Sequence, residues 1–444
     1  MAKTVREPER EVPVLGEWDV AVCGGGPAGC AAAIAAARHG ARTLLVEQLG
    51  FLGGTTVMSL VVPILSTNGV DFQGVWHEWI RALRRRNGVS PLTRGHPVGA
   101  HWLVGSVDPE LVKYAWDELL GDAGAGLLHY ALVAGAVVEA GRIRGVLVET
   151  KAGRRAILAR RVVDCTGDGA VCAQAGVPWE QGIDGQKWAM GVGFMWRMGN
   201  VPAVAEATPG QGVRGFGRTV GRRPECLGGM VRLLRVDPLD PWHLTRAAQE
   251  GRAEVWRRLA AARERPGLED AYLVDTALYP GVRQSRRIHG LATATGADAM
   301  EFRKYPDGVA RASWEVDIHS PTHPRAKGVA YDDPAYRPRI EAAKRGDYFD
   351  VRYGCLVAQA VDNLLVAGRC LSAEHEAQAS LRIQQTCVAT GQAAGTAAAL
   401  SLQARTTPRE LDPAALVARL EEDRGSVEPA FDLLRDLPIV DPGR

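Results

Sequence analysis

A glycine-rich turn between an expected strand and an expected helix constrains the fold of this chain most strongly. The strand is expected at residues 19–23 and the alanine-rich helix at residues 27–39. Gly24, Gly26 and Gly29 follow the pattern Gly-x-Gly-x-x-Gly across this junction. The first glycine permits a tight turn, the second lets the backbone approach a pyrophosphate, and the third lets helix and strand pack closely. The free N–H groups and partial positive charge of the helix N-terminus favour a phosphate at this turn.

A second apolar strand, expected at residues 41–47, completes a strand–helix–strand unit. Gly40 marks the end of the helix, and the crossover should be right-handed. The strand ends in Glu47, whose carboxylate is placed to accept hydrogen bonds from the ribose hydroxyls of an adenosine. A glycine-rich turn of some other α/β protein is the alternative, and both the context and the acid argue against it. We therefore predict an α/β protein with a Rossmann-type dinucleotide-binding domain.

Two further glycine-rich elements follow expected strands far downstream. Residues 163–169 read Val-Asp-Cys-Thr-Gly-Asp-Gly, and residues 363–369 read Asn-Leu-Leu-Val-Ala-Gly-Arg. A nicotinamide enzyme would need no second element of this kind. Together with the first turn, they resemble the FAD-binding signature of the glutathione-reductase-like flavoproteins, in which the late glycine segment meets the ribityl chain and the pyrophosphate.

A narrower resemblance covers most of the chain, from residue 19 to about residue 400. The matching stretches are GGGPAG with Glu47, FLGGTT, VDCTGDGAVCAQAG, GVRQSRRIHG, VDIHSP and NLLVAGRCLSAEHEAQASLRIQQTCVATGQAAG. The chain resembles the FAD-dependent oxidoreductase family that is related to fumarate reductase flavoproteins and to thiazole-synthase-like flavoproteins. The resemblance implies FAD as the cofactor. It does not imply one reaction, because the members of such a family differ in substrate.

The resemblance also implies which residues bind FAD. The helix expected at residues 386–403 would begin at the pyrimidine edge of the flavin, where its N-terminus stabilises negative charge on the reduced ring. Some relatives carry the flavin covalently on a histidine after Glu47. This chain has no histidine between His39 and His77, so we expect FAD to be held non-covalently. The predicted FAD-binding residues are Gly24, Gly26, Pro27, Ala28, Gly29, Glu47, Gln48, Gly53, Gly54, Thr55, Val133, Thr166, Gly167, Asp168, Gly368, Arg369, Thr386, Val388 and Gly391.

Composition and turn signals divide the chain into an α/β domain in two parts and an insertion. A helix is expected from Asp108 to Leu120, followed by a β-meander that ends in a strand at residues 161–165. The insertion is rich in Trp, Arg, Gly and Pro, with a helix at residues 241–265, and we interpret it as a β-rich α+β substrate domain. The predicted division is an N-terminal arm at residues 1–16, the FAD-binding domain at 17–180 and 348–404, the substrate domain at 181–347, and a C-terminal helix and tail at 405–444.

Five side chains are candidates for catalysis or for binding the substrate. When a hydride leaves carbon for flavin N5, a companion proton must leave oxygen or nitrogen, and histidine suits that role near neutral pH. His375 directly follows the late glycine segment and is the best placed, although a hydrogen bond to a loop carbonyl would explain it equally well. Arg283 and Arg286 could clamp a carboxylate, or could form ion pairs between the two domains. His319 and Arg382 complete the set.

The sequence predicts no metal site. His289, His319 and His323 with Asp317 are spaced too irregularly for a metal centre. None of the eight cysteines pairs as Cys-x-x-Cys, which argues against structural zinc, an iron–sulfur cluster and a dithiol motif. We interpret the cysteines as small apolar residues of a protein in a reducing cytoplasm.

The composition is typical of a soluble globular protein and gives no support for binding of nucleic acid or membrane. The net charge of +2 gives no large field of one sign, and no stretch reaches the ~18 apolar residues of a membrane span. We predict a cytoplasmic FAD-dependent dehydrogenase or oxidase that oxidises or reduces a small polar metabolite, with homo-oligomerisation left open. One alternative is a flavin electron-transfer subunit of a larger complex, which the lack of cysteine clusters disfavours. The other is an RNA-modifying flavoprotein, which the near-neutral charge disfavours.

Overall fold

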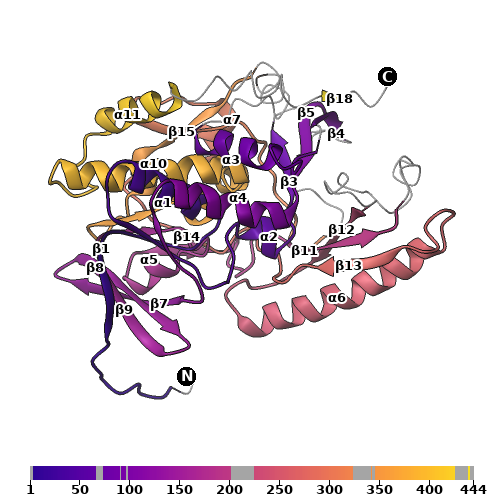
Figure 1. The fold of residues 1–444 in the computed structure, drawn as a ribbon, viewed down its shortest axis with the longest axis horizontal. Coiled ribbons are helices and arrows are strands. Elements are labelled where there is room, and N and C mark those ends of the chain that lie inside the picture. The colour runs from indigo at the N-terminus through magenta and orange to yellow at the C-terminus, as the bar shows by residue number, and fades with distance from the viewer. Residues whose placement is uncertain are drawn as a thin grey trace.

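The structure of this chain is a computed structural model, shown in Figure 1. It describes residues 4–66, 74–90, 92–96, 99–201, 225–323, 342, 346–425 and 439–440. A sheet of seven strands and the helices packed on it form the larger part of the molecule. A smaller sheet backed by one long helix lies beside it, at the lower right of Figure 1.

The seven-stranded sheet has the parallel core of a Rossmann-type fold, which confirms the predicted fold class. Its order is β6-β2-β1-β9-β8-β7, with β17 also paired to β9. The strands β6, β2, β1, β9 and β17 run parallel, whereas β7, β8 and the first half of β9 form the predicted antiparallel meander. The strands are β1 (Val14–Cys23), β2 (Thr43–Val46), β6 (Gly126–Leu128), β7 (Leu132–Glu139), β8 (Arg142–Thr150), β9 (Gly153–Asp164) and β17 (Leu364–Val366).

Two of these strands are longer than the sequence predicted. β1 begins at Val14, which pairs with Ala156, so the last three residues of the predicted arm at 1–16 extend the sheet. Their side chains are exposed or half-buried, and therefore lack the apolar run that marks a buried strand. The strand predicted at 161–165 is the end of β9, whose first half pairs with β8 and whose second half pairs with β17.

Two alanine-rich helices from opposite ends of the sequence pack closely over this sheet. They are α1 (Pro27–Arg38) and α10 (Gln384–Gln403), which begins two residues before the predicted start. A Cβ atom added to Gly391 would lie 2.0 Å from the carbonyl oxygen of Ala28, and one added to Gly395 would lie 2.0 Å from that of Ala32. The glycines of α10 therefore permit a contact between the two backbones that no larger residue allows.

The smaller sheet has the order β12-β11-β13 and is antiparallel. Its strands are β11 (Val192–Gly199), β12 (Glu225–Leu233) and β13 (Tyr272–Thr276). The helix α6 (Pro241–Arg263) packs on it and begins at Asp240, whose side chain accepts hydrogen bonds from two backbone N–H groups. Buried Phe194, Trp196 and Val255 form part of a separate core between helix and sheet. This unit is the β-rich part of the predicted insertion.

Other described residues of the range 181–347 pack on the larger part of the molecule. β14 (Arg286–Ile288) pairs with β10 (Trp179–Gln181), and β15 (Gly308–Ala312) pairs with β16 (Phe349–Arg352). Phe302 belongs to the same core as α1 and α10. The chain therefore returns to the first core before residue 348.

A four-stranded sheet that the sequence analysis did not predict has the order β18-β4-β5-β3. Its strands are β3 (Pro63–Ser66), β4 (Leu92–His96), β5 (Gly99–Ser106) and β18 (Ile439–Val440). The predicted helix after Asp108 is α4 (Pro109–Asp122), with Asp108 accepting hydrogen bonds at its N-terminus. The other helices in the described part of the chain are α2 (Thr55–Met58), α3 (Val75–Arg84), α5 (Ala170–Gln174), α7 (Gly296–Glu301), α9 (His375–Leu381) and α11 (Pro413–Gly425), with short 3-10 turns at Tyr353–Leu356 and Gly368–Cys370.

All eight cysteines lie in the described residues and are buried, and none forms a disulfide. Within the described ranges, no helix is both long enough and apolar enough to cross a bilayer.

Candidate active site

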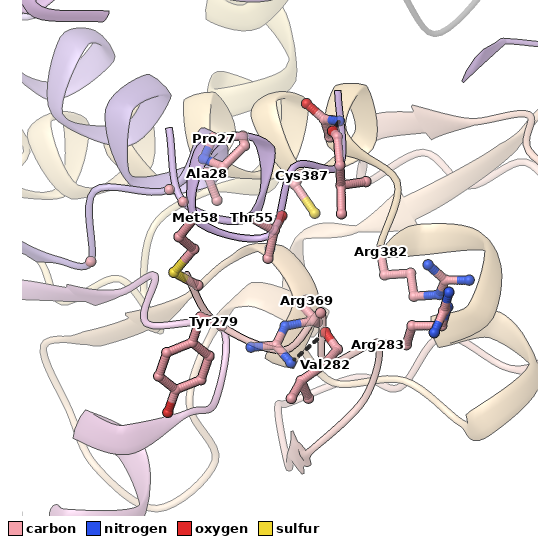
Figure 2. A pocket seen from close by; sticks show the side chains of 18 of the residues that line it. Pro27, Ala28, Thr55, Met58, Tyr279, Val282, Arg283, Arg369, Arg382 and Cys387 are labelled. Carbon is pink, nitrogen blue, oxygen red and sulfur yellow. Dashed lines mark hydrogen bonds between the residues drawn. The ribbon is translucent and has the colours of Figure 1, made fainter. Parts of the chain in front are cut away.

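One long cavity of about 850 Å³ runs from the glycine-rich turn after β1 to the inner face of the smaller sheet. Residues that directly follow β1, β2 and β9, together with the turn after β17, line its first part. This is the edge of an open α/β sheet at which ligands bind. Residues of β11, β12 and the loops around them line its far part, which Figure 2 shows in part.

The glycine-rich turn forms one end of the cavity. Gly24 has a φ of +99°, and a Cβ atom there would lie 2.6 Å from the carbonyl oxygen of Cys165, so only glycine fits. A Cβ atom on Gly26 would meet nothing closer than the Cα of Gly54 at 3.8 Å. No side chain caps α1, whose first residues Pro27 and Ala28 also line the cavity. The uncapped N–H groups of this helix are a ready site for phosphate oxygens.

Glu47 lines the same end and is buried. Its carboxylate accepts hydrogen bonds from the backbone N–H groups of Gly25, at 2.6 Å, and of Leu49, at 2.8 Å. Burial raises the pKa of this carboxyl, and the two hydrogen bonds act in the opposite direction. Each oxygen keeps a lone pair that can accept from a ribose hydroxyl.

An ion pair joins the two later glycine-rich elements. The guanidinium of Arg369 donates to the carboxylate of Asp168 at 2.8 Å and to the carbonyl of Val282 at 3.0 Å. The bond to Val282 is the dashed line in Figure 2. Ser285 donates to the same carboxylate at 2.6 Å. These bonds lock the turn after β9 to the turn after β17 and to the loop before β14.

The N-terminus of α10 lines the middle of the cavity through Gln384, Gln385 and Cys387. The side chain of Gln384 accepts from the hydroxyl of Thr56 at 2.7 Å and donates to the carbonyl of Val61 at 2.7 Å, which fixes the first turn of the helix. No side chain caps this helix, so its partial positive charge acts on the cavity.

Two arginines lie together at the far end of the cavity, where Figure 2 shows the guanidinium groups of Arg283 and Arg382 next to each other. Arg382 donates to the carboxylate of Asp317 at 2.8 Å and to its carbonyl at 2.9 Å. Arg283 donates to the carbonyl of Gly191 and contacts the sulfur of Met230, and it takes part in no ion pair among the described residues. Burial, with a smaller effect of Arg382, lowers the pKa of Arg283 to about 9.

His319 lines the same far end, and 8% of its surface is exposed. Its Nε2 lies 3.2 Å from Oδ2 of Asp317, the oxygen that also accepts from Arg382. Burial and the nearby charge of Arg283 lower the pKa of His319 to about 3, so the ring is neutral at pH 7. With Nε2 donating to Asp317, Nδ1 carries the lone pair, and it has no hydrogen-bond partner in the described part of the chain.

Comparison with known proteins identifies the family. Residues 19–420 match the family of FAD dependent oxidoreductases. The chain belongs to this family. FAD is therefore its cofactor, as the sequence analysis predicted, and the protein is a flavin-dependent oxidoreductase.

Curated relatives of this FAD-dependent oxidoreductase match over short stretches. The tRNA uridine 5-carboxymethylaminomethyl modification enzyme MnmG of Geobacter sulfurreducens is 32% identical over 166 residues, which are 34% of this chain and 24% of that protein. The dihydrolipoyl dehydrogenase of Trypanosoma brucei brucei is 47% identical over 51 residues, which are 12% and 11% of the two chains. The match thus spans about a quarter and about a tenth of the lengths of these relatives.

The solved structures that the chain resembles include an aromatic hydroxylase and a reductase-like protein. CabE, an aromatic hydroxylase from angucycline biosynthesis, has a TM-score of 0.48 and 18% identity, over 95% of this chain and 68% of that one. A geranylgeranyl bacteriochlorophyll reductase-like protein from Thermoplasma acidophilum has a TM-score of 0.46 and 13% identity, over 92% and 83% of the two chains.

The residues along the first part of the cavity fit FAD. Uncapped N–H groups at α1 face the place for a pyrophosphate, and Glu47 lies at the place for a ribose. The predicted FAD-binding residues that line the cavity are Gly24, Gly26, Pro27, Ala28, Glu47, Gln48, Gly54, Thr55, Val133, Thr166, Gly167, Asp168, Gly368 and Arg369.

Five predicted FAD-binding residues lie outside the cavity lining. Gly29 permits the contact of α1 with β1, because a Cβ atom there would lie 1.7 Å from the carbonyl oxygen of Gly24. Gly53 has a φ of +108° and shapes the turn before α2. Thr386 and Val388 are fully buried, and Gly391 contacts α1. The helix start is displaced from the prediction, so Gln384 and Gln385 line the cavity in place of Thr386 and Val388.

The structure brings three of the five candidate catalytic residues together and leaves two outside the cavity. Arg283, His319 and Arg382 line its far end. His375 does not line it: its Nδ1 lies 2.9 Å from Oε1 of Gln284, and the ring is buried. Its catalytic role stays a prediction, and its ring points into a polar network between α9 and the loop before β14.

Arg286 also lies outside the lining. It donates to the carbonyl of Asp168 at 3.0 Å, and its guanidinium lies over the ring of Trp179. Arg286 thus joins the segment at 281–288 to the FAD-binding part. This agrees better with the alternative that the arginines connect the two domains than with binding of a substrate carboxylate.

Sequence reasoning missed several residues of the cavity lining, namely Met195, Met230, Arg232, Tyr279, Trp314, Glu315 and Gln385. The predicted N-terminus of the last long helix could have indicated Gln385, because anionic groups of ligands often bind at helix N-termini. No local pattern marks Arg232, since its position depends on how β12 pairs with β11. Within the described residues, no group of three or more His, Cys, Asp or Glu side chains is arranged to hold a metal ion.

Proposed function

We propose that this protein oxidises or reduces a small polar organic molecule by exchange of a hydride between a substrate carbon and flavin N5. One observation carries the proposal: a single cavity joins the residues that fit FAD to a polar end lined by Arg283, Arg382 and His319. A small-molecule substrate bound at that end would lie directly beyond the cofactor. FAD supplies two-electron chemistry at N5 when bound.

The chain's own residues have separate tasks in this proposal. The uncapped N-terminus of α10 stabilises negative charge at the pyrimidine edge. Gly193 and Met195 of β11 line the far part of the cavity and exclude water from it. We propose non-covalent FAD, because no histidine lies in the stretch between His39 and His77.

Two other roles for the flavin find less support. The relative MnmG is by name a tRNA modification enzyme, but the net charge of +2 on this chain gives no broad field for a polyanion. An electron-transfer subunit would not need a cavity with arginines and a histidine beside the flavin. We therefore favour small-molecule chemistry.

The proposal is tested with the purified, yellow protein. Acid or heat should release FAD into the supernatant, whereas flavin that stays on the pellet would contradict non-covalent binding. The FAD-loaded protein is then mixed anaerobically with a panel of hydroxy and amino compounds, and its visible absorbance is followed. Bleaching by one chemical class is the expected result, and bleaching by none, in either direction of electron flow, would contradict the proposal.

A further inference from the structure

We propose that the substrate carries a carboxylate held by Arg283 and Arg382, and that His319 exchanges the companion proton of the hydride step. This inference rests on the function proposed above and names the substrate class of that site. It is carried by the donors and charges at the far end of the cavity.

The charge at this end favours an anion. Arg258 and Arg369 also line the cavity, but each pairs with a carboxylate, Glu254 and Asp168 respectively. The other charged residues there are three arginines, at 232, 283 and 382, and two acids, at 315 and 317. Arg382 pairs with Asp317, whereas Arg283 takes part in no ion pair among the described residues, so its positive charge lies in a largely buried part of the cavity, where water screens it poorly.

The guanidinium groups also have donors to spare. A guanidinium has five N–H donors. Arg283 uses one on the carbonyl of Gly191 and directs another at the sulfur of Met230, a weak acceptor. Arg382 uses one terminal nitrogen on Asp317, while its Nε is buried without a partner. Buried donors without acceptors are costly, and a carboxylate accepts bidentately from such groups.

His319 and Asp317 form a base with its orienting group. The Nε2–H of His319 donates to Asp317, which leaves the lone pair of Nδ1 as the proton acceptor. Burial is the largest cause of the lowered pKa of His319, and the charge of Arg283 is the second. A carboxylate bound to Arg283 cancels that charge, so the substrate itself makes His319 a better base.

The step is balanced in atoms and electrons. In the oxidative direction, a hydroxy carboxylate loses a hydride from carbon, with two electrons, to FAD, and loses the hydroxyl proton to His319. The carbon–oxygen bond becomes a carbonyl, and the product leaves as an oxo carboxylate. The reverse direction uses protonated His319 as the acid.

Binding is tested without turnover. FAD-loaded protein is titrated with malonate, with neutral malonamide and with inorganic phosphate, and the flavin difference spectrum and the thermal midpoint are recorded. Malonate should bind and malonamide should not. Arg283→Gln should weaken malonate by roughly 10- to 100-fold, the loss of one charge-assisted contact, and Arg283→Lys should restore part of it. Arg257→Gln, which removes an exposed arginine of α6, is the matched control and should bind malonate as the wild type does.

Four results of these titrations would contradict the proposed carboxylate site. Failure of malonate to bind by either readout, equal binding of malonamide, unchanged affinity in Arg283→Gln, or tighter binding of phosphate than of malonate would each overturn the carboxylate site.

Anaerobic flavin reduction tests the proton role and separates the two proposals. Hydroxy acids are compared with their amides, and His319→Gln is compared with the wild type. The acids should bleach the flavin faster than the amides, and His319→Gln should reduce about 10²–10⁴-fold more slowly while still binding malonate. Equal rates for acid and amide overturn the carboxylate claim and leave the proposed function standing. Wild-type rates in His319→Gln overturn the proton role, whereas bleaching by no compound defeats the proposed function itself.

Discussion

The imidazole Nε2 of His319 lies 3.2 Å from Oδ2 of Asp317, at the end of the cavity farthest from the glycine-rich turn. The ring is neutral in the folded protein because burial and the charge of Arg283 lower its pKa to about 3, against 6.5 for an unperturbed histidine. Two properties follow from this pair, a dependence of stability on pH and the acid–base chemistry proposed above.

We expect His319 to make the protein less stable as the pH falls. Between about pH 6.5 and pH 3 the unfolded chain binds a proton at this ring that the folded chain does not, so the free energy of unfolding decreases with falling pH, by at most about 1.4 kcal/mol per pH unit. His319→Gln removes this contribution. Its thermal midpoint should therefore fall less steeply than that of the wild type from pH 6.5 to pH 4.5, and parallel curves would show that the folded ring titrates normally.

His375 should behave differently from His319. It lies outside the cavity lining and bonds Gln284, and burial lowers its pKa as well. We therefore expect His375→Gln to lower the thermal midpoint while the rate of anaerobic flavin reduction stays at the wild-type value. A slow reduction in this variant, with FAD still bound, would return His375 to the catalytic role that its sequence position indicated.

Glu47→Ala should weaken FAD binding. The change removes the acceptor for the ribose and also leaves the N–H groups of Gly25 and Leu49 without their carboxylate. The loss of a charged hydrogen bond, about 1.5–3 kcal/mol, corresponds to a roughly 10- to 100-fold higher dissociation constant. Titration of apoprotein with FAD by flavin fluorescence measures it. An unchanged constant would mean that Glu47 does not contact the ribose.

Gly391→Ala should destabilise the protein through the contact between α1 and α10. The new Cβ atom would lie 2.0 Å from the carbonyl oxygen of Ala28, so the two helices must separate, a change typically worth about 1–3 kcal/mol. Gly121→Ala is the matched control, because nothing lies within 4 Å of its Cβ position in α4. That variant should be unchanged or more stable by up to about 1 kcal/mol. Denaturant titration of both compares them, and equal midpoints would refute the close contact.

Local patterns were enough to predict the FAD-binding part of the fold. The glycine-rich turn, the second strand and the cap at Asp108 are determined by neighbouring residues, and the structure has all three, although the strand is shorter than predicted and ends at Val46, directly before Glu47. The first half of β1 was missed because its exposed and half-buried residues lack an apolar run. Its pairing also depends on a distant part of the chain, since Val14 pairs with Ala156, 142 positions away.

The far end of the cavity could be predicted only in part. Arg283 and His319 were chosen for their chemistry, but nothing local placed them together. His375 was favoured because the chain on both sides of it is anchored near the flavin. The structure shows that anchored ends do not determine where a side chain points, since the ring turns toward Gln284. Asp317 lies only two residues from His319 in the sequence, but Arg382, which directly follows α9 and donates to the same carboxylate, is brought there only by folding.

A high-resolution structure of the protein with FAD and malonate bound tests the central claim most directly. The account predicts density for the dinucleotide along the first part of the cavity, the flavin ring at the N-terminus of α10, and malonate on Arg283 and Arg382 beside His319. An FAD ring that fills the arginine-lined end itself would contradict the account, because no room for a substrate would then remain beside the flavin. Malonate bound elsewhere would also contradict it, because Arg283 and Arg382 would then not be the carboxylate site.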